Sequence, residues 1–451
     1  MKRALLLNFL LVSVLSVSSQ TFNILDYGAD DSDKKLSTTA IQKTIDACAA
    51  NNGGTVLIPS GQFLTGTLQV FSDIEFHLSA GAVLLGSTDL EDYNKMHDQL
   101  IWGENLVNFS ITGTGKINGQ GESFFDKGEL QDQNSWRALE RPEPWIQFSN
   151  SQRIKIKDTQ FVNSPAHVLV FDNCSEVFVD GISIRNDLRS PNTDGIDIKG
   201  GKDILISNCF IETGDDAICL KANQQSVENM VVTNCILASD DSAIKFGTGS
   251  RHRIRNCQFS NINIRDTRYG IALFMNQGGI YENCLFQNIM IETASRHVME
   301  YPIFMDIDKR TSEFDLGKIQ NISFKDIRII SRGQILIAGQ KDAPIKDIDF
   351  DDVSLVLPNL ADPSKVQKKP RGNRKFKKVE GMMDLSGKSA NFVFGYVEGL
   401  SLNKLKTTTQ FDNHPLQRET FYFEEVKQLE VSKLKGTVTR EIPSSVKQGF
   451  F

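Results

Sequence analysis

The chain has 451 residues, of which 40% are hydrophobic and 24% charged, with 33 Gly and 12 Pro. This composition excludes a collagen, a low-complexity chain and a charge-dominated disordered protein. The 50 Lys and Arg residues against 56 Asp and Glu residues give a net charge of −6, which argues against non-specific nucleic-acid binding.

Residues 1–19 predict a secretory signal peptide. Lys2 and Arg3 precede a mostly apolar run over residues 4–17, and residues 17–19 suit a small-residue cleavage site. The run is shorter than the about 20 residues that a spanning helix needs, and no second run of that length follows. We therefore expect an exported protein, periplasmic or extracellular, with no membrane span; a membrane anchor is the alternative.

The next predicted element is an amphipathic helix over residues 38–48. Ile41, Ile45 and Cys48 lie on one face at helical spacing. After Gly54 the pattern changes to short strands of three to six residues separated by Gly, Asn, Asp or Ser, which is typical of an all-β fold.

Two internal repeats with steps of about 22–27 residues predict the architecture. One is an Asn-Cys pair, in which we expect the Asn residues to form one ladder at a bend and the Cys residues to be free and buried. The other is a strand with its preceding bend. The Asn-Cys pairs are 208–209, 234–235, 256–257 and 283–284, and the strand repeats are 165–171, 193–199, 215–221, 241–247 and 268–274.

A unit this short cannot bury its own apolar face, so the copies must stack. The repeats therefore predict a right-handed parallel β-helix, an all-β solenoid, with a short N-terminal capping helix and a single domain over residues 20–451. A sandwich or barrel is the alternative. Residues 361–379 contain eight Lys or Arg residues against one Asp. They predict a solvated basic loop, with a polyanion-binding strip as the alternative.

Carboxylates recur where the strand repeats begin. Neighbouring coils lie about 4.8 Å apart, so equivalent positions form columns. Asp194 and Asp216 share one column, Asp215 and Asp241 share the next, and Asp194, Asp215 and Asp216 should meet at one bend. Like charges this close raise at least one carboxyl pKa, which gives the acid and base that glycoside hydrolysis needs. An Asp turn ladder and a calcium site are the alternatives.

The motif Asn192-Thr193-Asp194, with Gly214-Asp215-Asp216 21 residues later, resembles glycoside hydrolase family 28, the polygalacturonase and rhamnogalacturonase-like family. Residues 22–29, 53–56, 118–121 and 141–142 match that family too, and the resemblance spans about residues 22–350. It implies a pectin-lyase-like β-helix and an inverting hydrolase without metal or cofactor. It also implies Asp215 as general acid, Asp194 and Asp216 as activators of water, and Asn192 as a substrate-binding residue that positions these aspartates or the sugar.

Two positions depart from the family pattern. Ser242 stands where the family has a His, and Gly270-Ile271-Ala272 stands where it has Arg-Ile-Lys. We hypothesise that Lys245 and Arg268 supply the substrate-facing positive charge instead, with Asp241 orienting Arg268. The alternative is an Asp241–Arg268 surface pair and a solvated Lys245.

Two further side chains are candidate substrate contacts. His167, at an outward strand position one coil before Gly195, is predicted to line a subsite. Tyr269, above the Asp194 and Asp216 column, is predicted to stack on a sugar. For each, a packing or surface role is the alternative.

The sequence therefore predicts a secreted inverting glycosidase that acts on an acidic, pectin-type polysaccharide or oligosaccharide. The departures favour rhamnogalacturonan or a modified pectic glycan over plain polygalacturonate. The competing functions are a β-helical polysaccharide lyase, which needs calcium and a cationic base, and a non-catalytic glycan-binding β-helix.

Overall fold

The structure is a computed structural model that describes residues 20–130, 135–293, 300–358, 379–409, 419–434 and 447–448. The predicted signal peptide and nearly all of the basic stretch 361–379 lie outside these residues. In the part of the chain that is described, no helix is long and apolar enough to cross a membrane.

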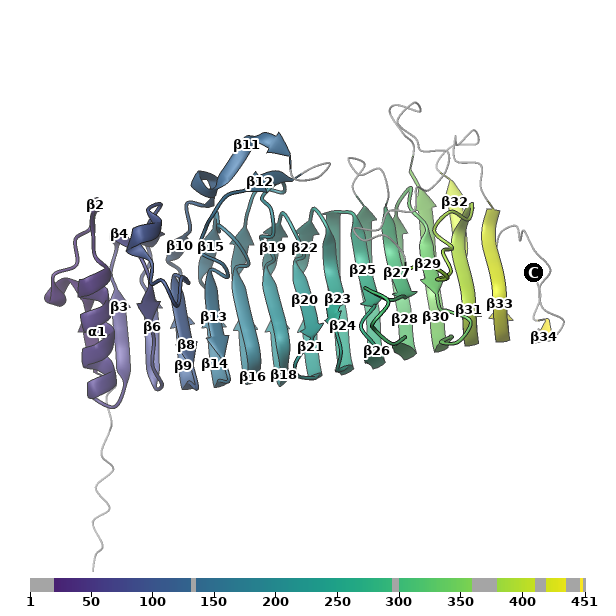
Figure 1. Ribbon diagram of the computed structural model, residues 1–451, viewed down its shortest axis with the longest axis horizontal. Coiled ribbons are helices and arrows are strands. Elements are labelled where there is room, and N and C mark those ends of the chain that lie inside the picture. The colour runs from purple at the N-terminus through teal and green to yellow at the C-terminus, as the bar shows by residue number, and fades with distance from the viewer. Residues whose placement is uncertain are drawn as a thin grey trace, which may run out of the picture.

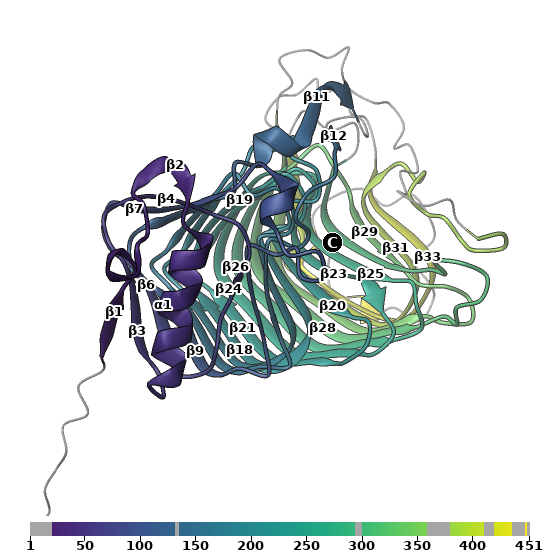
Figure 2. The same ribbon diagram turned by 60° about the vertical axis from the view of Figure 1, so that its left-hand side comes forward.

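The chain winds into a right-handed parallel β-helix, as the repeats predict. The strands of successive coils stand side by side in one long row (Figure 1), and the coils nest around a common interior (Figure 2). Helix α1 (Thr38–Ala50) lies at the N-terminal end of the row. It buries Ile41, Ile45 and Cys48, which confirms the predicted capping helix.

The paired strands of the described coils run parallel, and the exception is a small antiparallel hairpin of β11 (Phe125–Leu130) and β12 (Trp136–Ala138). Three short 3-10 turns cover Ile24–Tyr27, Leu90–Asp92 and Gly121–Phe124. The strands of the first coils are β1 Thr21–Asn23, β2 Ser32–Leu36, β3 Gly54–Ile58, β4 Gly61–Thr65, β5 Leu68–Gln69, β6 Ile74–Leu78, β7 Ala82–Gly86, β8 Ile101–Glu104, β9 Val107–Thr112, β10 Lys116–Asn118, β13 Ile146–Ser149, β14 Gln152–Lys157 and β15 Gln160–Val162. Those of the later coils are β16 Leu169–Asp180, β17 Ser183–Arg185, β18 Ile196–Ser207, β19 Phe210–Thr213, β20 Ile218–Ala222, β21 Val227–Thr233, β22 Ile236–Ser239, β23 Ser242–Ser250, β24 Arg253–Thr267, β25 Tyr269–Met275, β26 Ile280–Thr293, β27 Tyr301–Ile307, β28 Lys318–Ile330, β29 Ile335–Ala338, β30 Ile345–Leu357, β31 Ala390–Asn403, β32 Lys406–Thr409, β33 Glu419–Ser432 and β34 Lys447–Gln448.

Many strands are longer than predicted because pairing continues around the bends. Strand β24 has 15 residues and contains two Asn bends, at Asn256 and Asn261, where φ is 55° and 56°, and Asp266 near its end has a φ of 50°. Asn tolerates this left-handed backbone better than most residues. One such residue therefore turns the chain without ending the ladder of backbone hydrogen bonds.

The Asn-Cys pairs form two ladders, so the prediction of a single column is wrong. Asn234 donates to Asn208 and receives a bond from Asn261, whereas Asn283 donates to Asn256. In three successive coils both of two bends five residues apart use Asn, so a dipeptide alone does not identify its bend; these pairs are Asn229 and Asn234, Asn256 and Asn261, and Asn283 and Asn288. All seven cysteines are buried and free, which confirms the prediction for the four cysteines of the Asn-Cys pairs.

The interior is one continuous apolar cluster that extends through the coils. Part of it is a stack of aromatic rings, in which Phe286 lies 5.0 Å from Phe259 and 5.2 Å from Phe324 between ring centroids. Because each ring occupies the same register position as its neighbours, the stack keeps the coils aligned.

We expect Phe286→Ala to destabilise the protein by about 3–5 kcal/mol, because the ring is fully buried and its loss leaves a cavity. The denaturation midpoint in urea measures this loss. The matched control is Phe178→Ala, since Phe178 is 43% exposed. Equal midpoints for the two variants would contradict the role of the stack.

Candidate active site

The structure brings the three predicted aspartates together. Asp194 lies two residues before β18, and Asp215 and Asp216 lie just before β20. The backbone register pairs Ile196 with Ile218, which makes Asp194 and Asp216 neighbours. An oxygen of Asp194 lies within 4.8 Å of one of Asp216, and oxygens of Asp215, Asp216 and Asp241 also lie within 4.8 Å of one another.

Backbone contacts around Gly214 fix the bend that carries Asp215. The Gly214 N–H donates to the Thr193 hydroxyl at 3.0 Å, and a Cβ at Gly214 would come within 2.0 Å of the Ser190 carbonyl oxygen. The carbonyl oxygen of Asp215 accepts bonds from the Thr213 and Ser239 hydroxyls. These contacts explain why Gly and small hydroxyl residues flank the acidic pair.

The three carboxylates are unequally accessible. Asp194 is 3% exposed and Asp216 is 1% exposed, whereas Asp215 is 9% exposed. At the rim, the side chains of His167, Lys221, Asp241 and Arg268 are about a fifth exposed. The site is therefore more covered than the sequence suggests, and Asp215 is the aspartate of the three that best reaches a bound molecule.

Asn192 contacts Asp215, as expected for a positioning residue. Its side-chain amide nitrogen donates to Asp215 Oδ2 at 3.4 Å, and its oxygen accepts from Arg141 at 3.3 Å. The buried Arg141 also donates to the Pro191 carbonyl at 2.9 Å and binds Glu143. Arg141 therefore holds the segment that presents Asn192.

Two lysines bind the deeper carboxylates. Lys221 Nζ lies 2.9 Å from Asp194 Oδ2 and 2.6 Å from Asp197 Oδ2. Lys245 Nζ lies 2.7 Å from Asp216 Oδ2 and 3.6 Å from Asp241 Oδ2. The sequence interpretation missed Lys221 and Asp197. The sequence could have identified this ion pair, because both residues occupy outward strand positions on adjacent coils.

These charges separate the protonation states of the aspartates. Burial, reinforced by Asp194, Asp216 and Asp241, raises the pKa of Asp215 to about 8, although Lys245 opposes the shift. Burial also raises the pKa of Asp216, to about 6, against the opposing effect of Lys245. Burial opposes ionisation of Asp194 too, but Lys221, His167 and Lys245 hold its pKa below the usual range. The site thus pairs a protonated acid with an ionised base.

Lysine, rather than a metal, provides the positive charge in this donor set. Asp194, Asp216 and Cys219 have ligand atoms close enough to share an ion. However, the two lysine ammonium groups already bind these carboxylates, and burial raises the pKa of Cys219 well above its usual value, which disfavours a thiolate ligand. We therefore assign no metal to these residues.

His167 lies beside Asp194, one position away from the predicted alignment. Leu169 pairs with Ile196, so His167 rather than Ala166 is level with Asp194, and its Nε2 lies 3.4 Å from Asp194 Oδ1. Val168, Leu169, Val170 and Phe171 are all buried. Without alternation between apolar and polar residues, the sequence does not fix the register here.

The other predicted substrate contacts already bind protein groups. Arg268 lies 3.7 Å from Asp241, the predicted pair, and its guanidinium lies 5.1 Å from the centre of the Tyr269 ring. Tyr269 also stacks on Tyr301 and is 4% exposed. Its ring face is therefore covered by protein, and a sugar contact through it stays a prediction.

Both departures from the family pattern lie in buried surroundings. Ser242 is fully buried. Ala272 belongs to an apolar cluster outside the main core, with Tyr269, Tyr301 and Phe304. A long cation at position 272 would have to lie among these rings. The partly buried Phe274, which the sequence interpretation also missed, packs against this cluster 5.7 Å from Lys245 Nζ.

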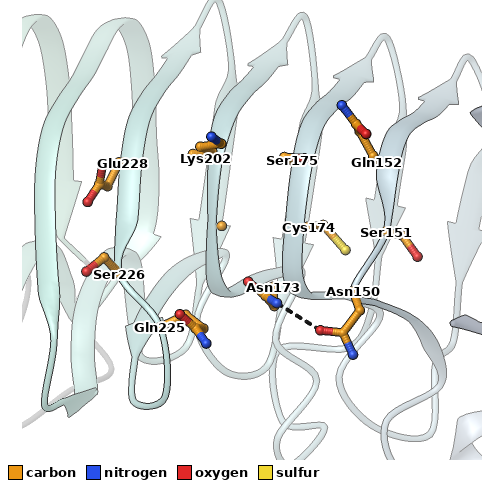
Figure 3. A pocket seen from close by; sticks show the side chains of 11 residues that line it. Asn150, Ser151, Gln152, Asn173, Cys174, Ser175, Lys202, Gln225, Ser226 and Glu228 are labelled. Carbon is orange, nitrogen blue, oxygen red and sulfur yellow. Dashed lines mark hydrogen bonds between the residues drawn. The ribbon is translucent and has the colours of Figure 1, made fainter. Parts of the chain in front are cut away.

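A separate polar hollow of about 550 Å³ lies away from these carboxylates. Figure 3 shows it at the bends of successive coils, lined by residues that include Asn150, Asn173, Lys202 and Gln225. None of the predicted site residues lines it.

Comparisons with known proteins identify relatives of the chain in sequence and in fold. Residues 48–370 match the model of a family described as glycosyl hydrolases family 28. The chain is 27% identical to a polygalacturonase from Chamaecyparis obtusa, over 79% of this chain and 71% of that protein. It is 25% identical to an exopolygalacturonase from Zea mays, over 68% of this chain and 76% of that protein. A family 28 exopolygalacturonase from Yersinia enterocolitica has a similar fold, with a TM-score of 0.71 and 20% identity over 92% of this chain and 78% of that chain.

The raised pKa of Asp215 predicts a pH-dependent gain in stability on substitution. The folded protein holds the Asp215 proton more tightly than the unfolded chain, so wild-type stability falls as pH rises from about 4 towards 8. Asp215→Asn cannot ionise and should be more stable than wild type by at least about 1 kcal/mol at pH 8, but not at pH 4. Thermal melts at both pH values measure this, with exposed Asp342→Asn as the control. A pH-independent difference would contradict the assignment.

Proposed function

Because the chain belongs to glycosyl hydrolases family 28, we propose that this glycoside hydrolase is a secreted, polygalacturonase-like enzyme that inverts the anomeric configuration of an acidic glycan. The observation that carries the proposal is the convergence of Asp194, Asp215 and Asp216, with Asp215 favoured as the protonated group. Such a pair of acid and base is what glycoside hydrolysis requires.

In the proposed reaction, Asp215 donates its proton to the glycosidic oxygen as the bond to the anomeric carbon breaks. Asp194 and Asp216 accept a proton from the water that attacks that carbon. Asp215 ends the cycle ionised and one base ends it protonated, and exchange with solvent restores both. Asn192 keeps Asp215 oriented through its amide hydrogen bond.

Burial supports water as the nucleophile. Asp194 and Asp216 expose 3% and 1% of their surface, so a small molecule reaches them more readily than a sugar ring does. The short distance between Asp215 and Asp216, whose oxygens lie within 4.8 Å, favours instead a retaining reaction with a carboxylate as nucleophile. Inverting carboxyl groups are usually about 6.5–9.5 Å apart and retaining ones about 5–5.5 Å apart. The burial of both bases favours the inverting reaction, and the configuration of the product anomer distinguishes inversion from retention.

The proposed substrate is a pectin-type glycan whose cleaved unit differs from plain galacturonate. The named relatives are polygalacturonases, which supports an acidic polymer. The apolar surroundings of Ala272 support an altered subsite, because position 272 itself supplies no positive charge there. Arg268, oriented by Asp241, is the proposed contact for an acidic group, with His167 and Tyr269 as further contacts.

Export is part of the proposal and is supported by the signal-peptide pattern of residues 1–19. A polymer that cannot cross a membrane has to be cleaved outside the cytoplasm. The free, buried cysteines are compatible with export, because buried thiols of this kind need no partner.

We expect the mature protein to release new reducing ends from a panel of pectic glycans with EDTA present. Asp194→Asn, Asp215→Asn and Asp216→Asn should each lower kcat by at least about 100-fold, because each removes a proton donor or acceptor. Proton NMR of the first product should show the inverted anomer. The matched control is Asp203→Asn, an exposed position in the strand that follows Asp194.

Three results would contradict this proposal. Retention would assign the reaction to a covalent route through a carboxylate. Unsaturated, UV-absorbing products lost with EDTA would favour the lyase alternative. Binding without turnover, unaffected by Asp215→Asn, would favour a glycan-binding protein.

The pH profile of kcat/KM should be bell-shaped, with limbs near pH 6 and 8. Activity falls below the lower limb because Asp216 becomes protonated and can no longer accept a proton, and above the upper limb because Asp215 loses the proton that it must donate. Initial rates between pH 4 and 10 measure both limbs. A profile that stays high well above pH 9 would exclude Asp215 as the acid.

A further inference from the structure

Each of the two buried base carboxylates is bound by a lysine from the following coil. Lys221, in β20, binds Asp194, which precedes β18, and Lys245, in β23, binds Asp216, which precedes β20. Each lysine also contacts a second carboxylate, Asp197 for Lys221 and Asp241 for Lys245. An Asp–Lys–Asp bridge therefore occurs on each of two successive coils. The two lysines hold different strand positions, because Lys245 pairs with Cys219, two residues before Lys221.

Each lysine binds one oxygen of its base and leaves the other uncommitted. Both lysine bonds go to Oδ2. Among the described residues, Oδ1 of Asp194 and Oδ1 of Asp216 are buried and have no hydrogen-bond partner. The imidazole Nε2 of His167 lies 3.4 Å from Asp194 Oδ1. A buried carboxylate oxygen without a donor is costly, so both atoms are ready to accept a bond from a small molecule.

We propose that Lys221 and Lys245 are positioning residues that keep Asp194 and Asp216 ionised and fix their orientation, so that Oδ1 of each accepts a hydrogen bond from the attacking water. The inference rests on the proposed hydrolytic function. It gives Lys245 a different task from the substrate contact that the sequence predicts, because its ammonium group is directed at Asp216 and its side chain is 11% exposed.

The charged groups around each base determine how its pKa should change when its lysine is removed. Asp194 faces Lys221 and His167, with Lys245 and the carboxylates of Asp215 and Asp216 nearby. Asp216 faces Lys245, with Asp194, Asp215, Asp241 and Lys221 around it. Loss of a lysine leaves a base among other carboxylates. Its pKa then rises, and the acidic limb of the activity profile moves to higher pH.

The test compares Lys221→Met and Lys245→Met with Lys202→Met. Lys202 is exposed and lines the hollow of Figure 3, away from the carboxylates, so its loss should change nothing. NMR titration of ¹³Cγ-labelled aspartates needs no substrate. We expect the titration midpoint of Asp194 to rise by about one pH unit or more in Lys221→Met, and that of Asp216 to rise likewise in Lys245→Met.

Kinetics give the second measurement. In both variants kcat should fall at least about tenfold at pH 6, with KM within about threefold of wild type, and part of the loss should be recovered at higher pH. If Lys221→Met does not fold, Lys221→Gln replaces it, because Gln keeps an N–H donor and removes only the charge.

The outcomes separate the two proposals. Unchanged aspartate midpoints would overturn the inference whether or not the enzyme cleaves a glycan. A raised KM with an unmoved acidic limb would also overturn it and return Lys245 to substrate binding. Raised midpoints together with a wild-type protein that cleaves no glycan would count against the hydrolytic function and leave the electrostatic coupling established.

Discussion

The stacking of parallel coils brings the aspartates of this site together, and it also buries their charges, which is energetically unfavourable. Coils about 4.8 Å apart bring Asp194, Asp215 and Asp216 together from two turns of the chain, where they sit at most 9% exposed. Several ionised carboxylates cannot share such a place unless cations accompany them. The same stacking supplies them, since Lys221 and Lys245 reach back by one coil to the aspartates before them. The catalytic chemistry and the neutralising charge therefore come from one geometric rule.

Much of this arrangement could be predicted because the repeat fixes which residues are neighbours. Once Ile196 and Ile218 are aligned, the aspartates two residues earlier, Asp194 and Asp216, must meet, and the register confirms that alignment. Prediction failed where the pattern is ambiguous. Because Val168–Phe171 are four consecutive buried residues, the sequence does not show how the strand repeat 165–171 aligns with the next one. The two Asn bends of a coil also look alike in sequence where both are present. Lys221 was missed because a strand lysine is usually solvated, and its direction depends on a partner, Asp197, on the preceding coil.

The departure from the family pattern at position 272 matches the apolar side chains that surround it. Where relatives of this family would place basic residues, the outward surface here contains Ala272, Phe304 and Leu336 in one apolar cluster. A cation at position 272 would have to lie among these apolar side chains, where it would lose contact with water. The positive charges occur one coil earlier, at Lys245, and at the strand start, at Arg268, and both face Asp241. The charge is thus retained but redirected towards the enzyme's own carboxylates, which changes what the site can offer to an acidic sugar.

Unequal burial and unequal neighbouring charge give chemically identical aspartate side chains different protonation states. Asp215 is the most exposed of the three, yet its burial, reinforced by three neighbouring carboxylates, raises its pKa to about 8. Asp194 lies deeper, but Lys221 and His167 overcome its desolvation and keep it ionised. In the proposed reaction, the group that touches the leaving sugar is therefore the more exposed one, and the group that contacts only a water molecule is the more buried one. Because a sugar ring cannot approach Asp194 or Asp216 without displacing the residues that cover them, this burial supports the proposal that water is the attacking group.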